Sequence, residues 1–112
     1  MAAPSDQFFF RVVHDNPPSL ADVMSPEAIG EPFVHPDPSR RRLWDGLSCY
    51  ATEAQTRRNA RRFRSHGAYI AVIRIEEGAP IRVERTLGAG HCTIWGDPVE
   101  ILARVIAVIP VR

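Results

Sequence analysis

The chain has 112 residues and a formal net charge of +1, with 45% hydrophobic and 24% charged residues. This length fits one ordinary globular domain, and the composition excludes a disordered polyelectrolyte. The longest apolar run, residues 105–111, is too short to cross a membrane, and residues 1–7 carry no secretory signal. We therefore expect a cytoplasmic protein without a membrane partner.

Six segments have the apolar, β-branched composition of strands: residues 8–14, 47–51, 68–75, 81–86, 91–95 and 105–111. In the first of these, Arg11 and His14 are expected on opposite faces because side chains alternate along a strand. The segment 68–75 is strongly apolar and predicts a central strand. Pro110 lacks a backbone N–H, which predicts that the last strand lies at an edge.

Helix signals separate these strands. Short helical segments are expected at 19–24, 25–30 and 39–44, and longer helices at 53–65 and 98–104. The expected N-cap residues are Ser19, Ser39, Thr52 and Asp97. In the helix 53–65, Gln55 completes a capping box, and Ala54, Ala60 and Phe63 are expected to form much of the buried face.

The order of these elements bears on the fold class. Three consecutive strands follow one helix, which favours an α+β fold with segregated helices over alternating α/β units. We expect one small domain over residues 1–112, with about three helices and a flexible N-terminus at 1–7. Cys49 and Cys92 lie in apolar strands, and we expect both to be reduced and structural.

His14 and Tyr50 form a first candidate constellation. His14 ends the first strand, and Tyr50 lies in the short strand that leads into the capped helix. An imidazole can hold ribose hydroxyls by hydrogen bonds, and a phenol ring can stack on a flat heterocycle. The alternative is that His14 is an ordinary strand-end residue and Tyr50 belongs to the core.

Two segments carry a resemblance to a known family. They are Phe-Phe-Phe-Arg-Val-Val-His at 8–14 and Gly-Leu-Ser-Cys-Tyr-Ala-Thr at 46–52, the latter followed by a helix with Ala54 and Ala60. Together they resemble the NAD-binding core of the ADP-ribosyltransferase superfamily. The resemblance implies a split, mostly antiparallel β core. It also implies transfer of ADP-ribose from NAD to an acceptor, or hydrolysis of NAD.

The resemblance also implies site residues. The family's first strand carries a histidine or arginine that binds NAD, which matches His14 or Arg11. Its second strand carries a serine or tyrosine, which matches Ser48 or Tyr50. A glutamate on a later strand polarises the nicotinamide ribose, and Glu84 is the nearest candidate. A degenerate, non-catalytic member of the family is the alternative.

The strand 91–95 offers another candidate for chemistry. Where the family's glutamate usually opens a strand, this chain has Gly90-His91-Cys92-Thr93. His91 is therefore a second candidate catalytic residue, as a polar contact or general base. No metal site is expected, because the adjacent His91 and Cys92 lack ligand spacing. The alternative is a core strand.

Arginines gather on the helix 53–65. All fourteen basic residues of the chain are arginine, and five lie within eight positions of this helix: Arg57, Arg58, Arg61, Arg62 and Arg64. With residues 40–42 they form a candidate phosphate-binding surface. The alternative function is therefore a non-catalytic basic module that binds nucleic acid or a protein partner through residues 57–64. A solvated helix face is the simplest interpretation of the run.

Overall fold

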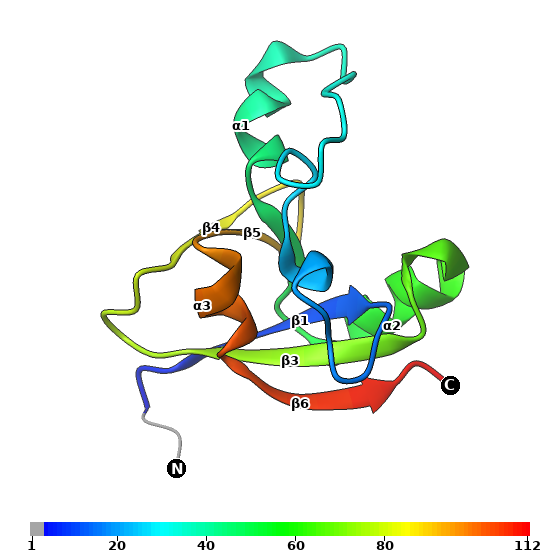
Figure 1. Ribbon diagram of the computed structural model, residues 1–112, viewed down its shortest axis with the longest axis vertical. Coiled ribbons are helices and arrows are strands. Elements are labelled where there is room, and N and C mark those ends of the chain that lie inside the picture. Colours follow the sequence, from blue (N-terminus) through cyan, green and yellow to red (C-terminus); the bar gives the residue numbers. More distant parts are fainter. Residues whose placement is uncertain (1–3) are drawn as a thin grey trace.

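The computed structural model describes residues 4–112, and its strands form one six-stranded antiparallel sheet in the order β4-β5-β2-β1-β3-β6 (Figure 1). The strands are β1 Gln7–Val13, β2 Leu47–Tyr50, β3 Tyr69–Ile75, β4 Arg82–Arg85, β5 His91–Trp95 and β6 Val105–Pro110. The helices are α1 Arg41–Trp44, α2 Glu53–Arg62 and α3 Pro98–Leu102, with 3₁₀ turns at Ala21–Val23, Pro38–Arg40 and Arg64–His66. This arrangement confirms the α+β class.

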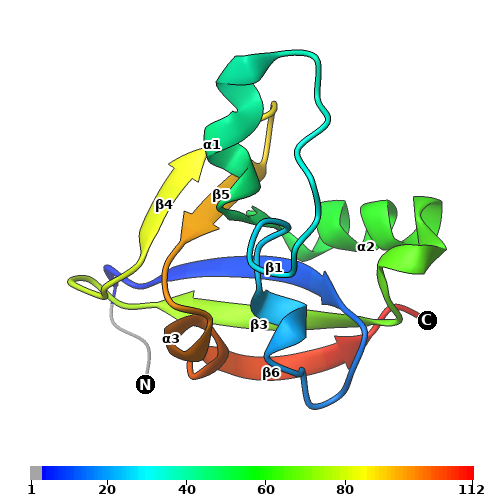
Figure 2. The same cartoon turned by 45° about the horizontal axis from the view of Figure 1, so that its top comes forward.

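The sheet has two parts that meet at β1 and β2. β1 pairs with β3 along its whole length, from Gln7 opposite Ile75 to Val13 opposite Tyr69. Against β2, in contrast, its registered pairing is Phe10 with Tyr50. Figure 2 shows β4 and β5 rising away from the layer of β1, β3 and β6. The backbone therefore opens between β1 and β2, beyond the Phe10–Tyr50 pair.

Apolar side chains fill both faces of the sheet. The larger cluster of buried residues joins both parts of the sheet with α3 and comprises Phe9, Val23, Leu47, Cys49, Ile73, Ile75, Cys92, Ile94 and Ile101. A smaller cluster under α2 contains Ala60, Ile70 and Val111. β3 contributes to both clusters, as expected for the apolar strand predicted to be central, and β6 lies at the predicted edge.

Helix α2 is shorter and less apolar than predicted. The Oγ1 of Thr52 accepts the backbone N–H of Gln55, which confirms the predicted cap. The helix ends at Arg62 because Phe63 leaves the helical region, with φ −123° and ψ 78°. Thr56 and Ala60 are its buried residues, whereas Ala54 and Phe63 are exposed, contrary to the sequence prediction.

The segment between β1 and β2 differs most from its prediction. Instead of a helix over 19–24 there is only the 3₁₀ turn Ala21–Val23, and residues 26–30 form turns. Frequent prolines leave too little uninterrupted chain for a helix. Asp37 rather than Ser39 caps the turn Pro38–Arg40, since its carboxylate accepts the Ser39 N–H at 3.0 Å. The lobe that carries α1 stands out at the top of Figure 1.

The expectation of a flexible N-terminus over residues 1–7 is wrong for part of that segment. Residues 1–3 lie outside the described residues, and Gln7, expected in the flexible segment, already pairs with Ile75 in the sheet. In the described part of the chain, no helix is long and apolar enough to span a membrane.

Candidate functional site

A cleft of about 670 Å³ lies where the sheet opens between β1 and β2. Its walls come from the end of β1 and the loop after it, from β2, and from the C-terminal end of α2 and the following turn. All four residues predicted to bind a cofactor line it: Arg11, His14, Ser48 and Tyr50. Segments far apart in the sequence thus meet at one concave surface, which is the usual form of a ligand site.

Arg11 is held in the opening of the sheet. Its Nε donates to the carbonyl of Asp22 and its Nη1 to the carbonyl of Ser48, both at 2.8 Å. Burial lowers the pKa of Arg11, while the nearby Cys49 and Asp22 raise it; an arginine nevertheless remains charged. None of the ion pairs formed among residues 4–112 involves Arg11. A fixed cation with donors to spare at the cleft wall is suited to binding an anion.

Asp22 shapes the loop that carries His14. Asp22 is 6% exposed, and its carboxylate accepts backbone N–H groups from His14 at 2.8 Å, Ser19 at 3.0 Å and Asp15 at 3.2 Å. Burial by itself raises the pKa of Asp22, but these hydrogen bonds outweigh it and lower the pKa below its ordinary value. This role was not predicted from the sequence. The available signal was the second of two acids that follow His14, eight positions after it.

His14 and Tyr50 contribute polar and aromatic groups to the cleft. β1 ends at Val13, so His14 begins the loop rather than ending the strand, and its side chain is exposed. Tyr50 is half-buried and meets the His91 ring edge to face, with centroids 5.3 Å apart at 88°. The alternative of Tyr50 as a purely core residue does not fit a side chain that lines the cleft.

The side chains of Ser48 on β2 and His91 on β5 are hydrogen-bonded to each other. The Ser48 hydroxyl lies 2.5 Å from His91 Nε2, and His91 Nδ1 lies 3.1 Å from the carbonyl of Thr86. A carbonyl can only accept, so the Thr86 carbonyl favours a proton on Nδ1, which leaves Nε2 to accept from Ser48. Burial lowers the pKa of His91, against a smaller opposing effect of the Thr86 bond, which favours the neutral ring. The pair thus has the polarity of a hydroxyl beside its base.

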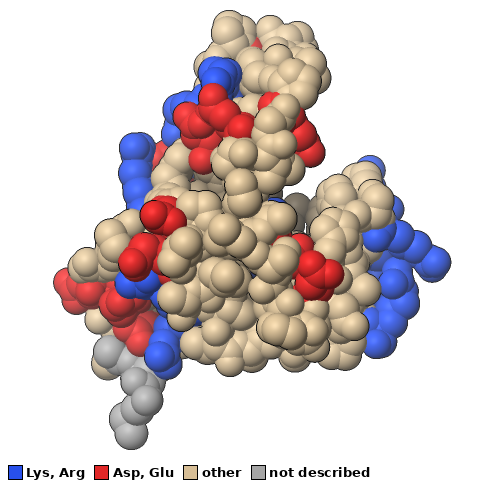
Figure 3. Space-filling model, in the orientation of Figure 1, with Lys and Arg blue, Asp and Glu red and all other residues tan. Residues whose placement is uncertain are grey.

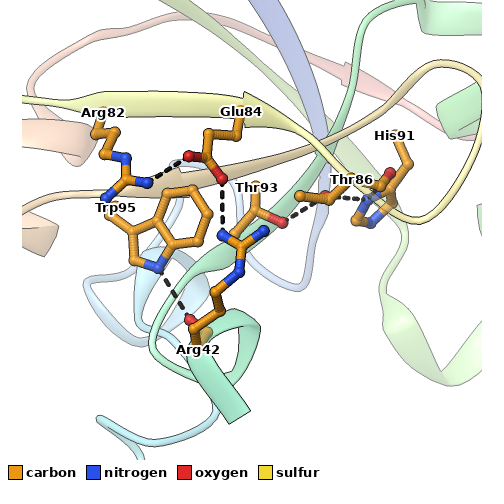
Figure 4. A network of polar contacts seen from close by, with 7 residues as sticks. All are labelled: Arg42, Arg82, Glu84, Thr86, His91, Thr93 and Trp95. Carbon is orange, nitrogen blue, oxygen red and sulfur yellow. Dashed lines mark hydrogen bonds and ion pairs between the residues drawn. The ribbon is translucent and has the colours of Figure 1, made fainter. Parts of the chain in front are cut away.

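The loop before β5 is tied to α2, which fixes the position of His91. The Gln55 amide donates to the carbonyl of Ala89 at 3.1 Å, and the Ala51 N–H donates to the carbonyl of Gly90 at 2.8 Å. Figure 4 shows the hydrogen bond between the His91 ring and the Thr86 hydroxyl, which also contacts the Thr93 hydroxyl. Gln55 in the first turn of α2 therefore also helps to position a candidate catalytic group.

A smaller, more apolar pocket of about 220 Å³ adjoins the cleft. Arg11 and Ser48 line both spaces, and His91 lines only the smaller one. The apolar walls of the smaller pocket include Phe33, Leu43, Trp44, Leu47 and Leu87. Ser48 therefore lies where the polar cleft and the apolar pocket meet.

Glu84 is outside both spaces. On β4, its carboxylate bonds Arg82 and also Arg42 of α1, the latter at 2.7 Å (Figure 4). Arg82 and then Arg42 lower the pKa of Glu84, which keeps it ionised. Trp95 Nε1 donates to the carbonyl of Arg42 beside this pair. The contacts of Glu84 attach the α1 lobe to the sheet, and they do not bring it to Arg11 or Tyr50.

The predicted arginine surface is only partly free. Arg57 donates to the carbonyls of Pro110 and Val111 and pairs with Glu53, so it anchors the C-terminal strand. The other four arginines of the run are exposed: Arg58, Arg61, Arg62 and Arg64. Figure 3 shows arginine atoms crowding the outer side of α2. Arg41 and Arg42 pair with Glu27 and Glu84, away from this surface.

No family model, curated protein or solved structure matches this chain. The geometry of the cleft and its surroundings is therefore the basis for a functional proposal.

Proposed function

We propose that the cleft binds NAD and that the protein is an ADP-ribosyltransferase-like enzyme, which transfers ADP-ribose to an acceptor or hydrolyses NAD. One observation carries the proposal: the four residues that the family resemblance assigns to NAD, Arg11, His14, Ser48 and Tyr50, line the same cleft. The opening of the sheet between β1 and β2 supports the split core that the resemblance implies.

Arg11, His14 and Tyr50 each bind a different part of NAD in this proposal. The Arg11 guanidinium, which lies near Asp22 but forms no ion pair within residues 4–112, binds the pyrophosphate. The His14 imidazole holds ribose hydroxyls at the mouth of the cleft. The Tyr50 ring, steadied by His91, stacks on nicotinamide near Ser48.

The chemistry is assigned to Ser48 and His91 rather than to Glu84. The bond between C1′ of the ribose and the nicotinamide nitrogen breaks, and nicotinamide leaves with the electron pair. A water or acceptor oxygen bonds to C1′, and its proton passes by way of the Ser48 hydroxyl to the neutral His91 ring. Glu84 is held by two arginines outside the cleft and takes no part in this step.

The binding step is tested by thermal unfolding and calorimetry with NAD. A ligand bound by the folded state alone stabilises it by about 2.7 kcal/mol at one hundred times its Kd. We expect NAD to raise the unfolding midpoint of the wild type and to have little effect on His14→Ala and Tyr50→Ala. Arg82→Ala, an exposed arginine outside the cleft, serves as the control. Wild-type affinity in both cleft variants would refute the proposal, as would failure of the wild type to bind millimolar NAD.

The chemical step is tested by release of nicotinamide from NAD. We expect His91→Ala and Ser48→Ala to retain most NAD affinity and to lose turnover by about 100-fold or more, because a general base contributes about 100- to 10,000-fold. Glu84→Gln should release nicotinamide at close to the wild-type rate. Loss of turnover in Glu84→Gln with full activity in His91→Ala would reverse the assignment.

A further inference from the structure

An exposed aromatic pair lies at the C-terminal end of α2. Phe63 is 41% exposed, and its ring stacks on His66, with centroids 5.2 Å apart and planes at 22°. The guanidinium of Arg62 lies 5.2 Å from the centre of the Phe63 ring. Instead of entering the core, as the sequence pattern predicts, the Phe63 side chain stays partly exposed to solvent, beside an imidazole and a cation.

Four exposed arginines lie on the segment of α2 and the following turn that carries this aromatic pair: Arg58, Arg61, Arg62 and Arg64. Within residues 4–112, none of the four forms an ion pair, in contrast to Arg57 of the same helix. The positive charge is therefore available to a polyanion, and it is concentrated on one side of α2 (Figure 3). We call Phe63, His66 and these four arginines the arginine–aromatic platform.

The platform continues into the cleft. His66 belongs to the stacked pair and also lines the cleft, together with Asn59 and Ser65 of the same segment. Asn59 Oδ1 lies 3.3 Å from His66 Nδ1, which steadies the imidazole at this junction. A chain bound on the platform would thus pass the mouth of the cleft.

We propose that the arginine–aromatic platform binds single-stranded nucleic acid. Arginines contact the phosphates of such a strand, and exposed rings stack on its bases, which is how proteins hold single strands without reading sequence. A duplex keeps its base faces stacked inside, and an acidic protein offers no planar bases to Phe63 and His66. This binding goes beyond the NAD site and does not depend on it.

The experiment measures fluorescence anisotropy of labelled oligonucleotides of about 12 nucleotides, a length within the usual site size. Ribo- and deoxyribo-oligonucleotides are both used, because phosphates and base faces are common to the two. With three or four phosphate contacts, affinity should fall about 20- to 50-fold between about 50 and 200 mM salt. A blunt duplex of the same length should bind more weakly than either single strand.

Matched variants separate stacking from charge. Phe63→Ala should weaken single-strand binding about fivefold or more, since one stacked base contributes at least that much. Phe8→Ala, which removes a similarly exposed ring on β1, is its control. Arg62→Glu should weaken binding and flatten the salt dependence, whereas Arg85→Glu, an equal charge change on β4, should not. Circular dichroism confirms that each variant is folded.

The remaining outcomes overturn the inference. Equal binding of duplex and single strand, unchanged by Phe63→Ala, would show a purely electrostatic surface. Full competition by polyglutamate in folded wild-type protein would identify an acidic protein as the partner. Absence of oligonucleotide binding at low salt would also refute it. None of these results bears on NAD, whose binding is scored independently by His14→Ala and Tyr50→Ala.

Discussion

Replacing Asp22 by asparagine should lower the free energy of unfolding, because this carboxylate organises the loop that carries His14. Three backbone N–H groups converge on it, from His14 on one oxygen and from Asp15 and Ser19 on the other. An asparagine can keep at most one of those oxygens. If it keeps the oxygen that accepts from both Asp15 and Ser19, its NH₂ group faces the His14 N–H, which is left without an acceptor.

The magnitude follows from these bonds. Hydrogen bonds to a charged group contribute about 1.5–3 kcal/mol, against about 1 kcal/mol for neutral pairs, so the two retained bonds lose about 1 kcal/mol each. The unpaired His14 N–H costs about 1 kcal/mol more, giving a total near 3 kcal/mol. For a chain of this length, that corresponds to a fall in the unfolding midpoint of about 12 °C.

The assay is urea unfolding of Asp22→Asn and wild type at several pH values. Because the pKa of Asp22 is lowered in the folded state, its contribution is complete above its ordinary pKa and is lost as pH falls through the folded-state pKa. The difference between the proteins should therefore be largest near neutral pH and shrink in acid. Asp15→Asn, an exposed neighbour, is the control. A difference below about 1 kcal/mol near neutral pH, or one unchanged in acid, would refute the reasoning.

Three further predictions concern other parts of the fold. Because burial lowers the pKa of His91, the folded state favours the neutral ring, so stability should decline as pH falls below the ordinary value of 6.5. This part of the decline should be absent from His91→Gln, and parallel pH profiles in urea titrations would contradict it. Burial raises the pKa of Cys49 to about 12 and also raises that of Cys92. Iodoacetamide should therefore modify neither thiol until denaturant is added, as judged by mass spectrometry. Thr52→Ala removes the cap of α2 and should lower the free energy of unfolding by about 1 kcal/mol, with Ser39→Ala as the comparison outside this helix.

Local patterns in the sequence predicted much of the secondary structure. Alternating apolar residues located all six strands, and β5 has the predicted boundaries, because a strand's composition reflects its own burial. Caps at Thr52 and Asp97 were predictable because a capping side chain acts within two or three residues of itself. The four candidate NAD residues could also be selected from short segments, through the family resemblance.

Tertiary contacts decided what those residues can do. Glu84 lies on a predicted strand, but its carboxylate pairs outside the cleft with Arg42, a partner 42 positions away. Phe63 fits the apolar pattern of α2, yet the helix ends one residue before it and leaves it exposed. For Glu84 the deciding contact lies outside the local window that a sequence pattern describes, whereas for Phe63 it is the backbone conformation at the end of the helix that decides.

The sequence by itself determined the six strands, the helices that begin at Glu53 and Pro98, the α+β class and a short set of candidate residues, because propensity, alternation and capping act between near neighbours. Only the tertiary structure decided that β1 and β2 part at the Phe10–Tyr50 pair and that Ser48 bonds His91. Those features depend on strand order and register. They are set by the burial of the whole sheet and are not encoded in any one segment.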